Sequence, residues 1–372
     1  MRYVPAILSG AVLSISLIEV QGAAEETKQS TSREIIHEET ARASDGKQRV
    51  DGAEELPIAA EGSLQNAAWS PNGAAIIFTR FRGGYNKGRA DILVFDFATR
   101  SVRTLIGGND TNVSQPGSTW NAHTDRVVFS STRAGHDEIF MIGGRGRSDT
   151  LKQLTYHEKY MAYEPSMSPD GRSVVFEAHP IDQETNGVIK RLTVDSLQVE
   201  ELTAPDEDCR QPNWSPAGDT IVYQKKADGR WNLWVYDIPT KTHRRLTDGE
   251  GDKTDATFSP DGRWVVYSAD NATLRRAALF AINLASGRKI QITDAGVYDG
   301  APSWSPDGKF IAFESTAGEE IKPGFLGWLR RLWARLFKLV QLEPPTRLWK
   351  IKVPEQILRD LCLAGPTCPR GG

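Results

Sequence analysis

One short motif constrains the fold of this chain more than any other feature: an apolar residue, usually aromatic, followed by Ser-Pro-Asp-Gly or a close variant. Ser at the first position, Pro at the second, Asp or Asn at the third and Gly at the fourth are the residues that a type I turn favours. An apolar run follows each turn, so each copy predicts strand, tight turn, strand. The intact copies are 69–73, 167–171, 214–218, 258–262 and 304–308.

The motif recurs at a regular spacing. A degenerate sixth copy, 120–125, has lost both the Pro and the Gly, and with it the copies are about 44 to 51 residues apart, a period typical of propeller repeats. Two further apolar segments per repeat give four short strands. Because one such sheet cannot bury both of its faces alone, the sheets must pack around an axis. The sequence therefore predicts an all-β fold, a six-bladed β-propeller with four-stranded antiparallel blades, plus an amphipathic helical insertion in the last blade.

The ends of the ring could be joined in two ways. The sixth repeat has a third strand at 348–353 but its fourth strand is ambiguous. Either residues near 50–58 supply that strand, or residues 357–362 do. The N-terminal alternative is favoured, because 355–361 contains better helix formers than strand formers.

The N-terminus has the composition of an export signal. Arg2 precedes an apolar run without charge, 3–18, and small residues follow at 22–24. This pattern predicts a secretory signal peptide and a periplasmic or secreted protein, with an uncleaved membrane anchor as the alternative. The predicted organisation is a signal peptide (1–24), a polar linker (25–50), the propeller (51–354, with the insertion at 319–345) and a C-terminal tail (355–372).

Composition and motifs argue against several functions. The formal net charge is −3, without the basic excess of a nucleic-acid-binding protein. There is no Gly-x-Ser-x-Gly elbow, no His-Glu-x-x-His and no phosphate-binding Gly loop, so we predict no catalytic residue, cofactor or metal. The acidic segment 248–252 lacks the Glu of a calcium loop, since Ser259 stands in its place. Cys209 is read as a packed side chain, while Cys362 and Cys368 could pair in an oxidising compartment.

The repeats resemble those of the TolB-type β-propellers, periplasmic Pro-Asp-repeat relatives of the WD-repeat fold. The resemblance rests on the motif at 302–308 and on the hairpin at 131–141, and it covers about 52–354. It implies the propeller fold and a role in the cell envelope. We expect a short linker here in place of the α/β domain that precedes the propeller in TolB, and the insertion at 319–345 is a further departure.

A propeller's innermost strands line its central channel. Counting three residues back from the apolar residue of each motif gives six equivalent positions, of which Gly117 and Ala301 are apolar. In a functional channel the polar ones would form a small-molecule or cation site, with Glu164 and Asp255 as an acid–base pair. In the alternative they only keep a water-filled channel solvated. The polar candidates are Asn66, Glu164, Gln211 and Asp255.

The insertion contains a segment, 325–340, that sorts into two faces on a helix. Its apolar face includes Trp328 and Trp333, and its polar face is purely basic. Such a helix is typical of a membrane interface with anionic lipid, but it could also bind a partner's groove or pack on the propeller itself. The basic side chains are Arg330, Arg331, Arg335 and Lys338.

Together these features predict an exported, TolB-like scaffold for protein–protein interaction in the cell envelope. Its expected partners are an envelope protein and an anionic membrane surface, not nucleic acid. The alternative is a propeller enzyme or small-ligand-binding protein with its site at the mouth of the channel.

Overall fold

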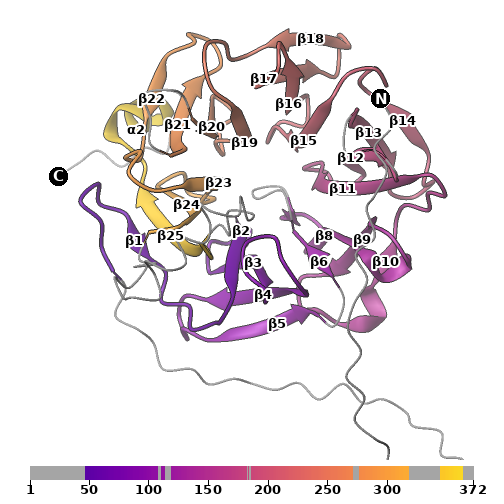
Figure 1. The fold of residues 1–372 in the computed structure, drawn as a ribbon, viewed down its shortest axis with the longest axis horizontal. Coiled ribbons are helices and arrows are strands. Elements are labelled where there is room, and N and C mark those ends of the chain that lie inside the picture. The colour runs from indigo at the N-terminus through magenta and orange to yellow at the C-terminus, as the bar shows by residue number, and fades with distance from the viewer. Residues whose placement is uncertain are drawn as a thin grey trace, which may run out of the picture. The chain divides into compact units, whose positions relative to one another are not determined.

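The computed structural model describes residues 47–107, 110–113, 119–181, 183, 186–270, 276–317 and 344–362. Six antiparallel sheets follow one another and stand around a common centre as the blades of a propeller (Figure 1). The predicted all-β, six-bladed fold with four-stranded blades is therefore confirmed. The predicted signal peptide, the insertion helix 325–340 and Cys368 lie outside the described residues, as does the side chain of Cys362.

Each blade is a meander whose first strand lies innermost. Blade one contains β2 (Ser63–Trp69), β3 (Ala75–Phe81), β4 (Ala90–Asp96) and β5 (Val102–Ile106). Blade two contains β6 (Thr111–Asn112), β7 (Trp120–Asn121), β8 (Arg126–Ser131), β9 (Glu138–Gly143) and β10 (Lys152–Gln153), with short 3₁₀ turns at Thr132–Ala134 and Ser148–Thr150. Blade three contains β11 (Tyr160–Met167), β12 (Ser173–Pro180), β13 (Val188–Thr193) and β14 (Val199–Glu201). Blade four contains β15 (Cys209–Trp214), β16 (Thr220–Ala227), β17 (Arg230–Asp237) and β18 (Thr242–Arg245). Blade five contains β19 (Lys253–Phe258), β20 (Trp264–Ala269), β21 (Ala278–Asn283) and β22 (Lys289–Gln291). Blade six contains β23 (Asp299–Trp304), β24 (Phe310–Ser315), β25 (Arg347–Lys352) and β1 (Glu54–Glu55).

The recurring motif forms the turn between the first and second strand of each blade. In blade six the N–H of Gly308 donates to the carbonyl oxygen of Ser305 at 2.9 Å. The Ser305 hydroxyl donates to Asp307 at 2.6 Å and accepts from the N–H of Phe310 at 2.9 Å. Gly308 has a φ of +72°, which a side chain would strain. In blade two, where the motif is degenerate, the innermost strand is split into β6 and β7.

The N-terminal segment closes the ring, as the sequence favoured. Glu54 and Glu55 of β1 pair with Lys350 and Trp349 of β25, and the N–H of Leu56 donates to the carbonyl of Leu348 at 2.8 Å. The competing segment forms a helix, α2 (Glu355–Cys362), that follows β25. The added strand pairs the edge of β25, which would otherwise be exposed.

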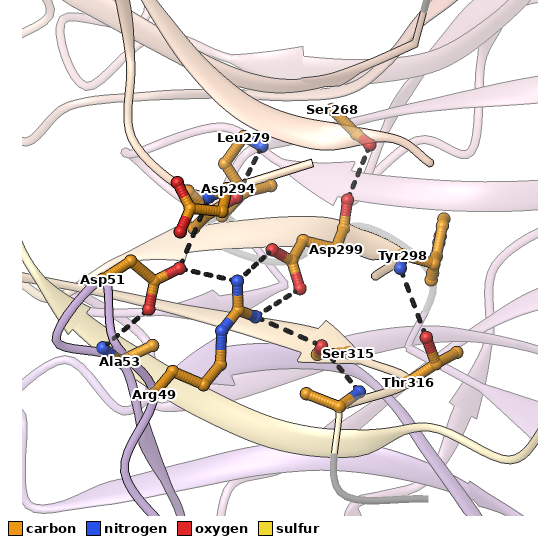
Figure 2. A network of polar contacts seen from close by, with 12 residues as sticks. Arg49, Asp51, Ala53, Ser268, Leu279, Asp294, Tyr298, Asp299, Ser315 and Thr316 are labelled. Atoms are coloured by element: carbon orange, nitrogen blue, oxygen red, sulfur yellow. Dashed lines mark hydrogen bonds and ion pairs between the residues drawn. The ribbon is translucent and has the colours of Figure 1, made fainter. Parts of the chain in front are cut away.

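A buried ion pair reinforces this closure (Figure 2). Arg49, just before β1, donates to both oxygens of Asp299 at 2.7 and 3.0 Å and to Asp51 at 2.6 Å. The Asp299 side chain is fully buried, whereas that of Arg49 is 13% exposed. The Arg49 guanidinium also lies 5.9 and 5.8 Å from the ring centres of Phe313 and Trp349. The closing segment is thus held by side chains as well as by its strand.

The described part of the chain contains no helix that is long and apolar enough to cross a membrane.

Candidate functional site

The inner wall of the ring carries a repeated irregularity. In five blades the pairing between the first and second strand shifts register, and one residue of the first strand has a positive φ. An extra residue in a strand twists it locally and re-aims a side chain. Because positive φ is costly for residues other than Gly, the surroundings must stabilise it. The bulged residues are Asn66, Glu164, Gln211, Asp255 and Ala301, with φ between 44° and 55°.

All four sequence-predicted channel residues therefore occupy one equivalent position in their blades, and Ala301 occupies it in a fifth. Gly117, the counterpart in blade two, lies outside the described residues. The equivalence follows from counting back from the turn motif, which keeps its spacing to the bulge in each of these blades.

The backbone N–H of a bulged residue donates a hydrogen bond to a side chain of the preceding blade. Glu177 of β12 accepts from the N–H of Gln211 at 2.8 Å, and Glu314 of β24 accepts from the N–H of Asn66 at 3.1 Å. The side-chain amide of Gln211 donates to Asp255 at 2.8 Å and accepts from its N–H at 3.1 Å. These bonds link neighbouring blades along the inner wall and offset the cost of the positive φ.

A polar cluster joins the inner walls of blades six and one. The carboxyl group of Glu314 is buried, and its Oε1 accepts from the hydroxyls of Tyr85 and Tyr298 at 3.2 and 3.1 Å. The two hydroxyls also contact each other at 3.1 Å. Burial, and then the negative charge of Asp255, raise the pKa of Glu314 to about 8. Glu314 is therefore a buried acid that holds its proton at neutral pH.

Asp255 belongs to the same electrostatic neighbourhood. Burial raises its pKa, while hydrogen bonds from Thr254, Gln211 and the backbone of Ala301 act in the opposite direction. The sequence paired Asp255 with Glu164 as the candidate acid and base. In the structure the charge of Asp255 acts on Glu314, a carboxyl group that the sequence analysis did not single out.

A signal for Glu314 was present in the sequence. The fourth or fifth residue of each second-strand run is polar, although the residue before it is apolar or aromatic, and in the structure it is buried. A buried polar residue that recurs at one position of a repeat indicates a bonding role, because unpaired burial is costly. These residues are Thr79, Ser130, Glu177, Gln224, Ser268 and Glu314.

Cys209 and the acidic segment 248–252, two other candidates of the sequence analysis, are engaged in contacts within the protein. Burial raises the pKa of the Cys209 thiol to about 12, so this residue is a packed side chain rather than a nucleophile. In the acidic segment 248–252 the ammonium group of Lys253 takes the position of a cation, donating to the carbonyls of Gly249, Glu250 and Gly251 at 2.9, 2.7 and 2.9 Å. Among the described residues, no group of three or more His, Cys, Asp or Glu is arranged to hold a metal ion.

Comparison with known proteins supports the fold and the repeats. The family model described as the TolB beta propeller domain matches residues 47–276. The Tol-Pal system protein TolB of Francisella tularensis (strain WY96-3418) is 23% identical over 229 residues, which are 61% of this chain and 51% of that protein. The uncharacterized peptidase YuxL of Bacillus subtilis is 31% identical over 114 residues, which are 29% of this chain and 17% of that protein.

Among solved structures, a putative TolB from Agrobacterium tumefaciens superposes with a TM-score of 0.54 at 16% identity, covering 78% of this chain and 90% of that one. At this identity the likeness concerns the fold. The chain spans about half the length of the Francisella TolB and much less of YuxL.

Proposed function

The chain belongs to the TolB β-propeller domain family, and from that premise we propose that it acts as a scaffold for protein–protein interaction in the cell envelope. The observation that carries the proposal is three exposed apolar side chains in the loops that enter β11 and leave β12. Tyr156 is 67% exposed, Tyr160 36% and Ile181 39%. Aromatic side chains are enriched at protein interfaces relative to the rest of the protein surface.

Tyr160 and Ile181 lie on neighbouring segments of blade three, and the Tyr156 hydroxyl donates to the carbonyl of Gln153 in β10 of blade two at 3.3 Å. Tyr160 pairs with Pro180, and the N–H of Ile181 donates to the carbonyl of Lys159 at 3.0 Å. The segments belong to the loop that enters β11 and the loop that leaves β12, which lie at the end of the blade opposite the Ser-Pro-Asp-Gly turn because the strands are antiparallel. We call Tyr156, Tyr160 and Ile181 the blade-three patch.

Site-specific photo-crosslinking in cells of the source organism tests this function. We expect benzoylphenylalanine at Tyr160 to give a discrete crosslinked protein, because an interface residue is held against its partner. Benzoylphenylalanine at Val199, which is 44% exposed on the outer strand of the same blade, is the matched control. Equal patterns at both positions, or no discrete product at Tyr160, would contradict a partner at the blade-three patch.

The proposal includes export and attachment to a membrane surface. It is supported by the leader-like composition of residues 1–24 and by the two faces of the segment 325–340. A basic, Trp-containing amphipathic helix combines apolar burial with attraction to anionic lipid. Such a helix would keep the scaffold at the membrane while leaving the propeller's surfaces open to protein partners.

Binding to vesicles tests this attachment. We expect the protein without residues 1–24 to sediment with anionic vesicles at low salt and much less with neutral ones, because each Arg or Lys near an anionic surface contributes on the order of 1 kcal/mol. Trp333→Glu should weaken binding to both kinds of vesicle, and Arg330→Glu with Arg331→Glu only binding to anionic vesicles. If wild type fails to sediment with anionic vesicles, or if Trp333→Glu only lowers the melting temperature, the helix packs on the propeller or on a protein instead.

A small-ligand or enzymatic site at the channel is the second candidate, favoured by the raised pKa of Glu314 beside Asp255. It is the weaker one, because all four carboxyl oxygens already accept hydrogen bonds from the protein. Asp255 accepts from Gln211 and Thr254, and Glu314 from Asn66 and the two tyrosines. A ligand would have to displace these donors.

A further inference from the structure

Helix α2 shows how the turn-bearing end of the propeller binds a short helix. It covers the boundary between blades five and six, where Ile357 is fully buried and Leu358 and Leu361 pack on the same apolar cluster. That cluster includes Trp264, the first residue of β20, and Trp304, the last residue of β23. α2 thus places aliphatic side chains at positions i, i+1 and i+4 between two blades.

Polar contacts fix the same helix at its edge. Arg263, the residue after the turn of blade five, donates to the carbonyl of Asp360 at 3.1 Å. Arg288 lies 3.6 Å from the Asp360 carboxylate. The acidic residue at i+3 therefore faces the basic side chains of blade five.

At the next boundary along the ring, between blades six and one, the described residues leave an open groove with a volume of about 530 Å³. Its residues are equivalent in the repeat to those beneath α2: Trp69 corresponds to Trp304, and Phe310 to Trp264. Phe97 stacks on Trp69 with ring centres 5.3 Å apart. The main lining residues are Trp69, Pro71, Phe97, Pro306, Phe310 and Lys350.

The basic side chain that follows the turn of blade five has a counterpart in blade six. Lys309 follows the turn of blade six, as Arg263 follows that of blade five. Lys309 is 65% exposed, and its contact with Asp307 is 3.5 Å long. Lys350 lies over the Phe310 ring at 5.2 Å. A helix in this groove would bring its residue at i+3 to Lys309, as α2 brings the backbone of Asp360 to Arg263, and the Lys309 ammonium would attract a carboxylate there.

The groove is also continuous with the surface that α2 already occupies. Leu361 packs against the blade-six turn, since a Cβ on Gly308 would lie 3.5 Å from its methyl group. The other side of that turn, through Pro306 and Asp307, lines the groove. One turn thus separates an occupied inter-blade site from an open one of the same construction.

We propose that the groove between blades six and one binds a short amphipathic helix of a partner protein, with aliphatic residues at i, i+1 and i+4 and a carboxylate at i+3. This is the helix-in-groove mode of peptide recognition, and its template is α2, the helix that the propeller binds from its own chain. The site is on the opposite end of the ring from the blade-three patch, so it does not depend on the function proposed above.

The probe for this site is a fluorescent peptide of residues 353–361, held helical by a crosslink between positions 355 and 359, which are exposed in α2. Anisotropy titration is made against the full chain. We expect saturable binding that Phe97→Asp weakens at least tenfold. Ile238→Asp, the same change at the equivalent position of blade four, is the matched control and should leave the affinity unchanged.

A charge exchange keeps the test valid if Phe97→Asp impairs folding, which melting curves will show. Lys309→Glu, an exposed change, should weaken binding of the peptide about twofold to fivefold, and a peptide carrying Asp360→Lys should restore it. No binding, or binding that is indifferent to both Phe97→Asp and Lys309→Glu, would overturn the proposal.

Two other occupants give distinct outcomes, and each would overturn the proposed partner helix. If the groove is filled by a second copy of the chain, light scattering will show a dimer that Phe97→Asp dissociates. If it is filled by the chain's own last residues, ending the chain after Cys362 will raise the affinity for the peptide severalfold.

Discussion

Replacing Arg49 with Met is expected to lower the free energy of unfolding by about 3–5 kcal/mol, the usual cost of removing one partner from a buried ion pair. Arg49 donates to both oxygens of Asp299, whose side chain is fully buried. Without the guanidinium, Asp299 must remain buried and unpaired or take up a proton. Because Arg49 also holds the segment that carries β1, the variant should lose the closure of the ring first. Urea denaturation followed by tryptophan fluorescence measures the change.

Two further variants separate the ion pair from packing. Asp299→Asn combined with Arg49→Met should recover much of the loss, because both charges are then gone. Arg147→Met is the control: Arg147 pairs with Asp149, but both side chains are more than half exposed, so its stability should match wild type within error. If Arg49→Met is no less stable than Arg147→Met, the buried pair does not secure the closing segment.

The second large effect concerns the stability of the protein as a function of pH. A glutamate in the unfolded chain loses its proton near pH 4.5, whereas Glu314 in the native protein loses it near pH 8. Between these values the native state holds a proton that the unfolded state has released. The contribution of Glu314 protonation to the free energy of unfolding is therefore fully present below about pH 4.5 and is lost as the pH rises to about 8. This loss amounts to at most roughly 5 kcal/mol.

Glu314→Gln removes this titration while keeping the shape of the side chain and an oxygen for the N–H of Asn66. We expect the variant to resemble wild type in unfolding free energy near pH 5 and to be the more stable of the two near pH 9. Glu177→Gln, at the equivalent position of blade three, is the control. It measures how much the unfolding free energy changes when another inner-wall glutamate is replaced by glutamine. Parallel stability curves for wild type and Glu314→Gln between pH 5 and 9 would mean that Glu314 is ionised in the native protein.

Local sequence signals were sufficient for the architecture. The Ser-Pro-Asp-Gly turn is specified by its own residues, since the Ser305 hydroxyl, the Asp307 carboxylate and Gly308 complete it within four positions. Its spacing indicated the number of blades, and counting back from it selected Asn66, Glu164, Gln211 and Asp255 as equivalent positions, which the structure shows to be bulged. The same local reasoning identified the helical tendency of α2 and so assigned the closing strand to the N-terminal segment.

What the tertiary structure decided is which side chains meet. Arg49 and Asp299 are 250 residues apart in sequence, and Tyr85 and Glu314 are 229 apart. No local pattern specifies such pairs, because they form only when the N-terminal segment and the first blade meet the last blade. The same holds for Glu314: its pKa depends on burial among the assembled blades and on the negative charge of Asp255 in blade five. The sequence alone determined the repeat and the turn, whose hydrogen bonds are short-range, whereas the contacts that lock the ring depend on how the blades pack.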